Sequence, residues 1–163
     1  MAARYDAIIF GAGPAGLTAG IYMARARLKT LIIDTGTVGG QMVLSYEVAN
    51  YPGVEATTGH EISQTMLRQA KSFGCEVISQ AEVASVDLSG TMKVVEVIDE
   101  GRFEAPVVIV ATGGRPRTLG LESEERFGGQ GISYCATCDG DFFTDQEIVV
   151  IGGGNSALEE AVS

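Results

Sequence analysis

The feature that most limits the fold of this chain is a group of spaced glycines near its amino terminus. Residues 11–16 read GAGPAG, the pattern G-x-G-x-x-G, and they follow the apolar stretch 5–10. A buried strand that enters such a turn and then a helix is typical of a βαβ unit that binds a dinucleotide. Gly11 would make the tight turn, Gly13 would admit a pyrophosphate, and Gly16 would let the helix pack closely.

Apolar periodicity predicts the elements that follow this turn. A helix is expected over 14–27 and a strand over 31–33, which ends at Asp34. An acid about 20 residues after the first glycine accepts hydrogen bonds from a ribose. The other elements expected before residue 115 are a glycine-rich loop over 34–47, a helix over 58–73 with a capping box between Thr58 and Glu61, a strand over 77–79, a β-meander over 83–88, 92–98 and 102–104, and a strand over 107–110.

A second glycine motif lies close to the end of the chain. A polar linker is expected over 115–130, and a strand over 147–151 leads into GGGNSA at 152–157, the pattern G-x-G-x-x-A, where a helix begins near Ser156. Two such motifs are typical of enzymes that pass electrons between a flavin and a nicotinamide. A βαβ unit needs about 30 residues, and the 12 from Gly152 to Ser163 are too few. The sequence therefore predicts a fragment of a longer protein.

The three cysteines point to redox chemistry rather than to a metal. Cys135 and Cys138 have C-x-x-C spacing and precede Asp139. Thiols at this spacing can close a small disulfide. A zinc site with His60 and Cys75 is the alternative by count, but the predicted helix separates those two residues by about 22 Å, too far for one ion. No metal is expected, Cys75 is expected to be a buried apolar residue, and His60 is expected at the surface.

Composition excludes several classes of partner. The 163 residues carry 11 basic and 21 acidic side chains, a net charge of −10, which disfavours binding to nucleic acid or an anionic membrane. No stretch approaches the ~18 apolar residues of a membrane span, and no signal peptide is expected from the first residues. We therefore expect a cytoplasmic protein. The acidic group Glu122, Glu124 and Glu125 is expected to be a solvated face.

Taken together, these motifs resemble the low-molecular-weight thioredoxin reductases, a family of pyridine-nucleotide-disulfide flavoproteins. The resemblance covers the whole chain, and its most specific stretch is SYCATCDG at 133–140. The other matching segments are 11–16, 39–41, 50–53, 111–114 and 152–157. The resemblance implies an α/β fold with a three-layer, Rossmann-like FAD-binding domain and a β-meander insertion over 1–114. Residues 115–163 would be a linker with the redox-active, truncated start of an NAD(P)H-binding domain.

The resemblance also implies roles for individual residues. Cys138 would face the flavin, Cys135 would attack the partner's disulfide, and Asp139 would exchange protons with the thiols. Asp34 stands where the family usually has glutamate. The positions expected at FAD are Gly11, Gly13, Pro14, Ala15, Gly16, Asp34, Thr35, Gly39, Gly40, Gln41, Asn50, Val83, Ala111, Thr112 and Gly113. The positions expected at NADPH are Gly152, Gly153, Gly154, Asn155, Ser156 and Ala157.

The expected function is electron transfer from NADPH through FAD and the Cys135–Cys138 disulfide to thioredoxin or a similar small protein. The longer protein would be a homodimer, and the 163-residue chain alone would be incomplete. One alternative is the flavoprotein subunit of an alkyl hydroperoxide reductase. That subunit usually carries an additional amino-terminal redox domain, so a first glycine motif at Gly11 disfavours it. The other alternative is an inactive fragment that only binds FAD.

Overall fold

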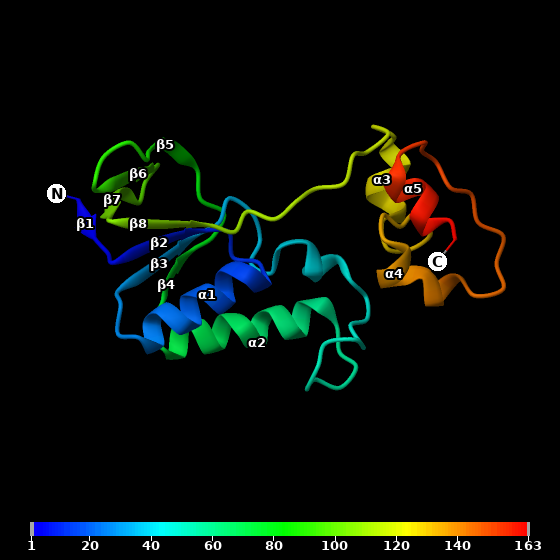
Figure 1. Cartoon of the computed structure of the whole chain (residues 1–163), viewed down its shortest axis with the longest axis horizontal. Helices are drawn as coiled ribbons and strands as arrows, with labels where there is room; N and C mark the ends of the chain where they lie inside the picture. The colour runs from blue at the N-terminus through cyan, green and yellow to red at the C-terminus, as the bar shows by residue number, and fades with distance from the viewer. Residues whose placement is uncertain (1, 163) are drawn as a thin grey trace. The chain divides into compact units, whose positions relative to one another are not determined.

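The computed structural model describes residues 2–162, and the chain divides into two compact units, Met1–Arg115 and Pro116–Ser163. The first unit has three layers (Figure 1). A parallel sheet forms the middle layer, two helices cover one face, and an antiparallel meander covers the other. The Rossmann-like α/β fold that the sequence predicts is thus confirmed.

The middle layer is a sheet of four parallel strands. Their order is β4 (Glu76–Ile78), β3 (Thr30–Ile33), β2 (Ala7–Phe10) and β8 (Val107–Val110). Ile9 lies in register with Ile32 on one side and with Ile109 on the other. Strands that are covered on both faces read as continuous apolar runs, which is why each of these segments was recognisable in the sequence.

Helices α1 (Pro14–Arg25) and α2 (Gly59–Ser72) cover one face of this sheet. The predicted capping box at the start of α2 is present, because Thr58 Oγ1 accepts the Glu61 N–H at 3.1 Å and Glu61 Oε2 accepts the Thr58 N–H at 3.3 Å. The buried residues of this layer are Ile9, Ala12, Leu17, Ile32, Val38, Ile62, Met66, Ala70 and Cys75. The predictions of a buried Cys75 and an exposed His60 are confirmed.

The meander β5 (Val83–Asp87), β6 (Lys93–Val97) and β7 (Gly101–Ala105) covers the other face. A short strand that the sequence analysis missed, β1 (Ala3–Arg4), pairs in parallel with β7. The buried residues between the two sheets are Tyr5, Ile8, Leu31, Ile33, Ala81, Val95, Val97, Phe103 and Ala105. Successive side chains of a strand point to opposite faces, so Ile8 faces the meander while Ile9 faces the helices.

The second unit is built from short helices. These are α3 (Glu122–Phe127), α4 (Ala136–Asp139), the 3-10 helix η2 (Gly140–Phe143) and α5 (Asn155–Glu160). The start of a helix near Ser156 is as predicted. The linker predicted over 115–130 is wrong in part, because α3 lies within it. The prediction that the acidic group is a solvated face is also wrong for Glu124, whose side chain is buried.

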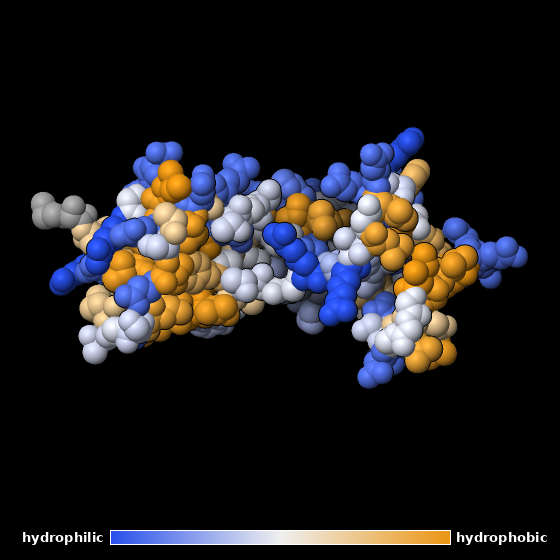
Figure 2. Space-filling model, turned by 90° about the horizontal axis from the view of Figure 1, so that it is seen from above, coloured by the Kyte–Doolittle hydropathy of each residue, from blue (hydrophilic) through white to orange (hydrophobic). Residues whose placement is uncertain are grey.

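The strand predicted over 147–151 is wrong. These residues form no strand, and Ile148 and Val149 are 62% and 87% exposed. A strand exists only where a neighbouring strand exchanges backbone hydrogen bonds with it, and none of residues 116–162 pairs with this segment as a strand. Hydrophobic side chains, drawn in orange, reach the surface of the second unit at the right of Figure 2. Within residues 2–162, no helix has the length and apolar character to cross a membrane.

Candidate functional site

The glycine turn between β2 and α1 is closely packed. Gly11 has φ +104°, and its N–H donates to the Ile33 carbonyl at 2.8 Å. A Cβ on Gly11 would collide with the carbonyl oxygen of Ala111, and a Cβ on Gly16 would collide with that of Gly11. Both positions therefore require glycine, for the packing reasons that the motif predicts.

The carboxylate of Asp34, at the end of β3, binds the backbone of two loops. Its Oδ2 accepts the Ala12 N–H at 2.5 Å, and its Oδ1 accepts the Gly36 N–H at 2.7 Å. The sequence analysis expected Asp34 to bind a ribose and missed this structural role. A carboxylate can accept about four hydrogen bonds, so two remain for a ligand hydroxyl. Asp34 thus holds the glycine turn in place and keeps capacity to bind.

The amino end of α1 is an open cradle made mainly of backbone. No side chain caps this helix, and a Cβ on Gly13 would meet only Gly40 Cα, at 3.9 Å. Gly39, at the start of the 3-10 helix η1 (Gly40–Leu44), donates its N–H to the Ala12 carbonyl at 2.8 Å and holds the two glycine segments together. Free N–H groups at a helix amino end bind phosphate, so this cradle fits the pyrophosphate of a dinucleotide such as FAD.

The structure brings some of the predicted FAD residues together and leaves others apart. The residues that adjoin this cradle and its turn are Gly11, Gly13, Gly16, Gly39, Gly40 and Ala111 through their backbones and Asp34 through its carboxylate. Thr35, Gln41, Asn50, Thr112 and Gly113 are exposed, and of these Thr112 adjoins the turn, because its Cα would lie 3.2 Å from a Cβ on Gly11. The side chain of Val83 packs against the core between the sheets. The role of each residue in binding FAD stays a prediction.

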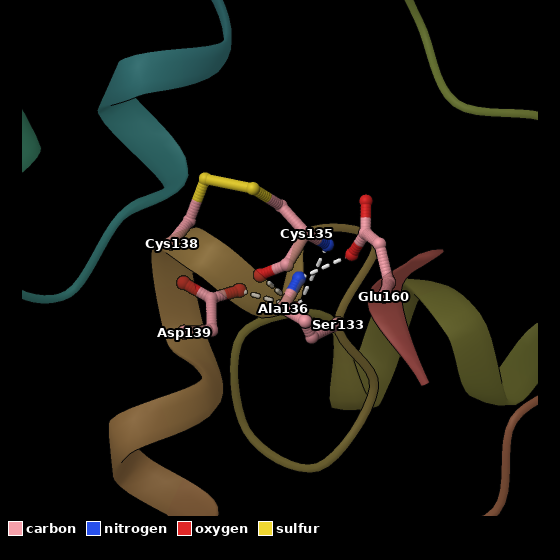
Figure 3. Close-up of a disulfide and its surroundings, with 6 residues drawn as sticks. All are labelled: Ser133, Cys135, Ala136, Cys138, Asp139 and Glu160. Atoms are coloured by element: carbon pink, nitrogen blue, oxygen red, sulfur yellow. Dashed lines mark hydrogen bonds between the residues drawn. A yellow bond between two sulfur atoms is a disulfide. The ribbon is translucent and has the colours of Figure 1, made fainter. Parts of the chain in front are cut away.

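In the second unit, Cys135 and Cys138 form the expected disulfide, shown in Figure 3. Their Cα atoms are 5.2 Å apart. Cys135 immediately precedes α4, and its carbonyl accepts the Cys138 N–H at 3.2 Å and the Asp139 N–H at 3.1 Å. This short turn holds both cysteines and the acid in one segment, and the Cys138 residue is exposed to solvent.

Ser133 fastens Asp139 to the disulfide loop. Its hydroxyl donates to Asp139 Oδ2 at 2.6 Å and accepts the Cys135 N–H at 3.1 Å. The sequence analysis did not single out Ser133. Its position two residues before Cys135 is a signal that could have found it, because serine hydroxyls often bind backbone groups two residues away.

Glu124 is a second anchor of this loop. Tyr134 donates its hydroxyl to Glu124 Oε1 at 2.5 Å, and the N–H groups of Leu119 and Leu121 each donate to the carboxylate at 2.8 Å. These hydrogen bonds lower the pKa of Glu124, and the one from Tyr134 has the largest effect. The hydrogen bond between the two side chains also raises the pKa of Tyr134. The residue next to Cys135 is thereby tied to α3.

The second glycine motif forms no comparable cradle. Gly154 precedes α5, and a Cβ on Gly153 or Gly154 would meet nothing within 4 Å. Residues 152–157 are mostly exposed, and no strand lies before them. The role of these residues in binding NADPH stays a prediction.

No three histidine, cysteine or acidic side chains of residues 2–162 come close enough together to hold a metal ion. Cys75 lies under the helical layer, where burial raises the pKa of its thiol. Such a thiol is a poor nucleophile at neutral pH.

Comparison with known proteins shows the family to which this chain is similar. A family model described as pyridine nucleotide-disulphide oxidoreductase matches residues 5–163. The thioredoxin reductases of Peptoclostridium acidaminophilum and Bacillus subtilis are 48% and 46% identical to this chain, each over 97% of it. The matches cover 50% and 49% of those two proteins. The chain thus spans about half the length of the curated relatives it matches.

Solved structures give the same result. The thioredoxin reductase from Streptococcus pyogenes matches with a TM-score of 0.89 and 42% identity, over 99% of this chain and 52% of that one. The thioredoxin reductase from Giardia duodenalis matches with a TM-score of 0.88 and 37% identity, over 98% of this chain and 52% of that one.

Proposed function

Since this chain belongs to the family of pyridine nucleotide-disulphide oxidoreductases, we propose that the complete protein is a thioredoxin reductase. It passes electrons from NADPH through FAD to the Cys135–Cys138 disulfide, and from there to thioredoxin or a similar small protein. The observation that carries this proposal is the disulfide beside Asp139, in a chain that also has a dinucleotide-type cradle. The homodimer and the cytoplasmic location stay predictions.

The first unit contributes the flavin-binding part. The amino end of α1, with the N–H groups of Ala15 and Gly16, would bind the pyrophosphate, and Asp34 would bind the ribose. Asp34 also accepts the Ala12 N–H, so the same carboxylate would hold the turn and the ribose. A bound flavin would supply two-electron transfer between a nicotinamide and the disulfide.

The reduced cysteines carry out the exchange with the partner. The Cys135 thiolate attacks one sulfur of the partner's disulfide, which breaks that bond, forms a mixed disulfide and releases one partner thiolate. The Cys138 thiolate then attacks Cys135 Sγ, re-forms the Cys135–Cys138 disulfide and releases the second partner thiolate. Two electrons pass to the partner. Asp139, held by Ser133 on the same loop, is placed to take protons from the attacking thiols and give them to the leaving thiolates.

The assay for this exchange uses the complete protein. Cys135→Ser should abolish reduction of thioredoxin, because the attack on the partner's disulfide needs the Cys135 thiolate. NADPH should still bleach the flavin absorbance near 450 nm, because reduction of the flavin does not need Cys135. Cys75→Ala is the control and should keep both activities, since Cys75 is buried in the core of the first unit. Reduction of thioredoxin by the Cys135→Ser protein would refute the proposal. Failure with thioredoxin but activity with a peroxidase partner would favour an alkyl hydroperoxide reductase.

The flavin site is tested in the 163-residue chain. Gly13→Val would fill the space beside Gly40, so flavin retained after gel filtration should fall at least tenfold. Gly153→Val is the matched change in the second glycine motif, where a side chain meets nothing within 4 Å, and it should leave the flavin content unchanged. Equal flavin contents in the two variants would mean that FAD does not bind at the first turn.

A further inference from the structure

The carboxylate of Glu160 reaches the disulfide loop from a different helix. Glu160 is the last residue of α5, and its Oε2 accepts the N–H of Ala136, the first residue of α4 (Figure 3). Ala136 directly follows Cys135. The N–H groups in the first turn of a helix have no partner within that helix. In α4, one of them is satisfied by a side chain 24 residues further along the chain.

The position of Glu160 in its own helix does not explain why a glutamate stands there. A negative charge at the carboxyl end of a helix opposes the helix dipole, so Glu160 does not help to stabilise α5. The same carboxylate accepts a backbone N–H at the start of α4, a single helical turn. Glu159 precedes it on the same helix and is exposed. The contact with α4 thus gives Glu160 a role that its neighbour does not share.

We propose that Glu160 is a positioning residue of the redox site, which holds the first turn of α4 and places a negative charge beside Cys135. The inference rests on the proposed function, because it takes the Cys135–Cys138 disulfide to be redox-active. Exchange proceeds through thiolates, and a nearby carboxylate makes both an incoming and a leaving thiolate less favourable. Glu160 therefore slows exchange at this disulfide. It also ties α5, the helix that follows the second glycine motif, to the redox loop.

Reduction by dithiothreitol measures this effect directly. A dithiothreitol thiolate attacks one sulfur of the Cys135–Cys138 disulfide, and its second thiol then displaces that cysteine. The products are two cysteine thiols and cyclic oxidised dithiothreitol. The substitutions to compare in the 163-residue chain are Glu160→Gln, which keeps an acceptor oxygen without the charge, Glu160→Ala, which removes both, and Glu159→Gln as the control.

Two measurements on these variants decide the proposal. Hydrogen exchange at the Ala136 amide should stay within about threefold of the parent chain in Glu160→Gln and should accelerate about tenfold in Glu160→Ala. Reduction by dithiothreitol at pH 7 should accelerate about three- to tenfold in both Glu160 variants. In Glu159→Gln, that rate should stay within about twofold of the parent rate.

Three results would overturn the proposal. These are unchanged amide protection in Glu160→Ala, an unchanged rate of reduction in Glu160→Gln, and an equal acceleration in Glu159→Gln. Should Glu160→Ala fail to fold, the Glu160→Gln and Glu159→Gln rates still decide. Both measurements need no flavin, nucleotide or protein partner, so their outcome is independent of the thioredoxin assay that tests the proposed function.

Discussion

Adding a single methyl group at Gly16 tests whether the third glycine of the motif is needed for packing. Gly16 and Gly20 are both buried glycines of α1, one helical turn apart. In the interior of a helix, Gly→Ala ordinarily stabilises by about 0.5–1 kcal/mol, because alanine loses less backbone entropy on folding. The surroundings of the two positions predict departures of different size from this rule.

At Gly16, the new Cβ would overlap the carbonyl oxygen of Gly11, a backbone atom of the turn that α1 follows. Relief requires α1 to move away from the sheet, and overpacking of this kind costs typically about 1–3 kcal/mol. At Gly20, the nearest atom is the end of the Ile32 side chain, at 2.7 Å, which can rotate away. We expect a net loss of about 1–2 kcal/mol for Gly16→Ala and a change within about 1 kcal/mol for Gly20→Ala.

Urea denaturation of the 163-residue chain, followed by circular dichroism at 222 nm, measures both changes in the free energy of unfolding. Flavin retention after gel filtration should fall in Gly16→Ala alone, because the turn that binds the pyrophosphate is displaced there. The reasoning is refuted if Gly16→Ala is as stable as the parent chain, or if Gly20→Ala loses as much stability.

Three further predictions follow from the second unit. Thiol counting in denaturant should give one thiol per chain before mild reduction and three afterwards; an unchanged count would exclude a reversible Cys135–Cys138 disulfide. Because hydrogen bonds hold the pKa of Glu124 below its ordinary value of about 4.3, their stabilisation is complete above that pH and is lost as the pH falls through the lower folded pKa. The protection of the Leu121 amide should therefore weaken as the pH falls below that ordinary value, should already be absent at pH 7 in Glu124→Ala, and should be unaffected by Glu125→Ala; no difference between the two variants would contradict the assignment. The 163-residue chain should not reduce thioredoxin with NADPH, since Gly153 and Gly154 line no cradle, and turnover at enzyme-like rates would show this expectation to be wrong.

The elements of the first unit were predictable because their signals are local. A buried strand, a glycine turn and a helix that begins with Pro14 each depend on residues close together in the sequence. The capping box at Thr58 and Glu61 spans a single helical turn, and it was found for the same reason. Even there, β1 was missed, because two residues carry no periodicity and pair only with a strand about 100 residues away.

The errors lie where an element depends on a partner elsewhere. Residues 147–151 have the composition of a strand, but composition provides no neighbour for their backbone hydrogen bonds. Glu124 has the charge of a surface residue, yet three donors make its burial favourable. Leu121 lies three residues before Glu124, which is the spacing of a capping box, but it lacks the serine or threonine side chain of that motif.

For the candidate site, the sequence by itself determined which residue types are present and their order along the chain. It placed a glycine turn before a helix, an acid after the next strand and two cysteines before another acid, because these chemical patterns depend on spacing alone. Only the tertiary structure decided that Asp34 binds the turn through Ala12, that Ser133 holds Asp139, and that Glu160 reaches the loop at Ala136. The physical reason is that a hydrogen bond requires two groups about 3 Å apart, and for residues 22 or 24 positions apart only the folded chain sets that distance.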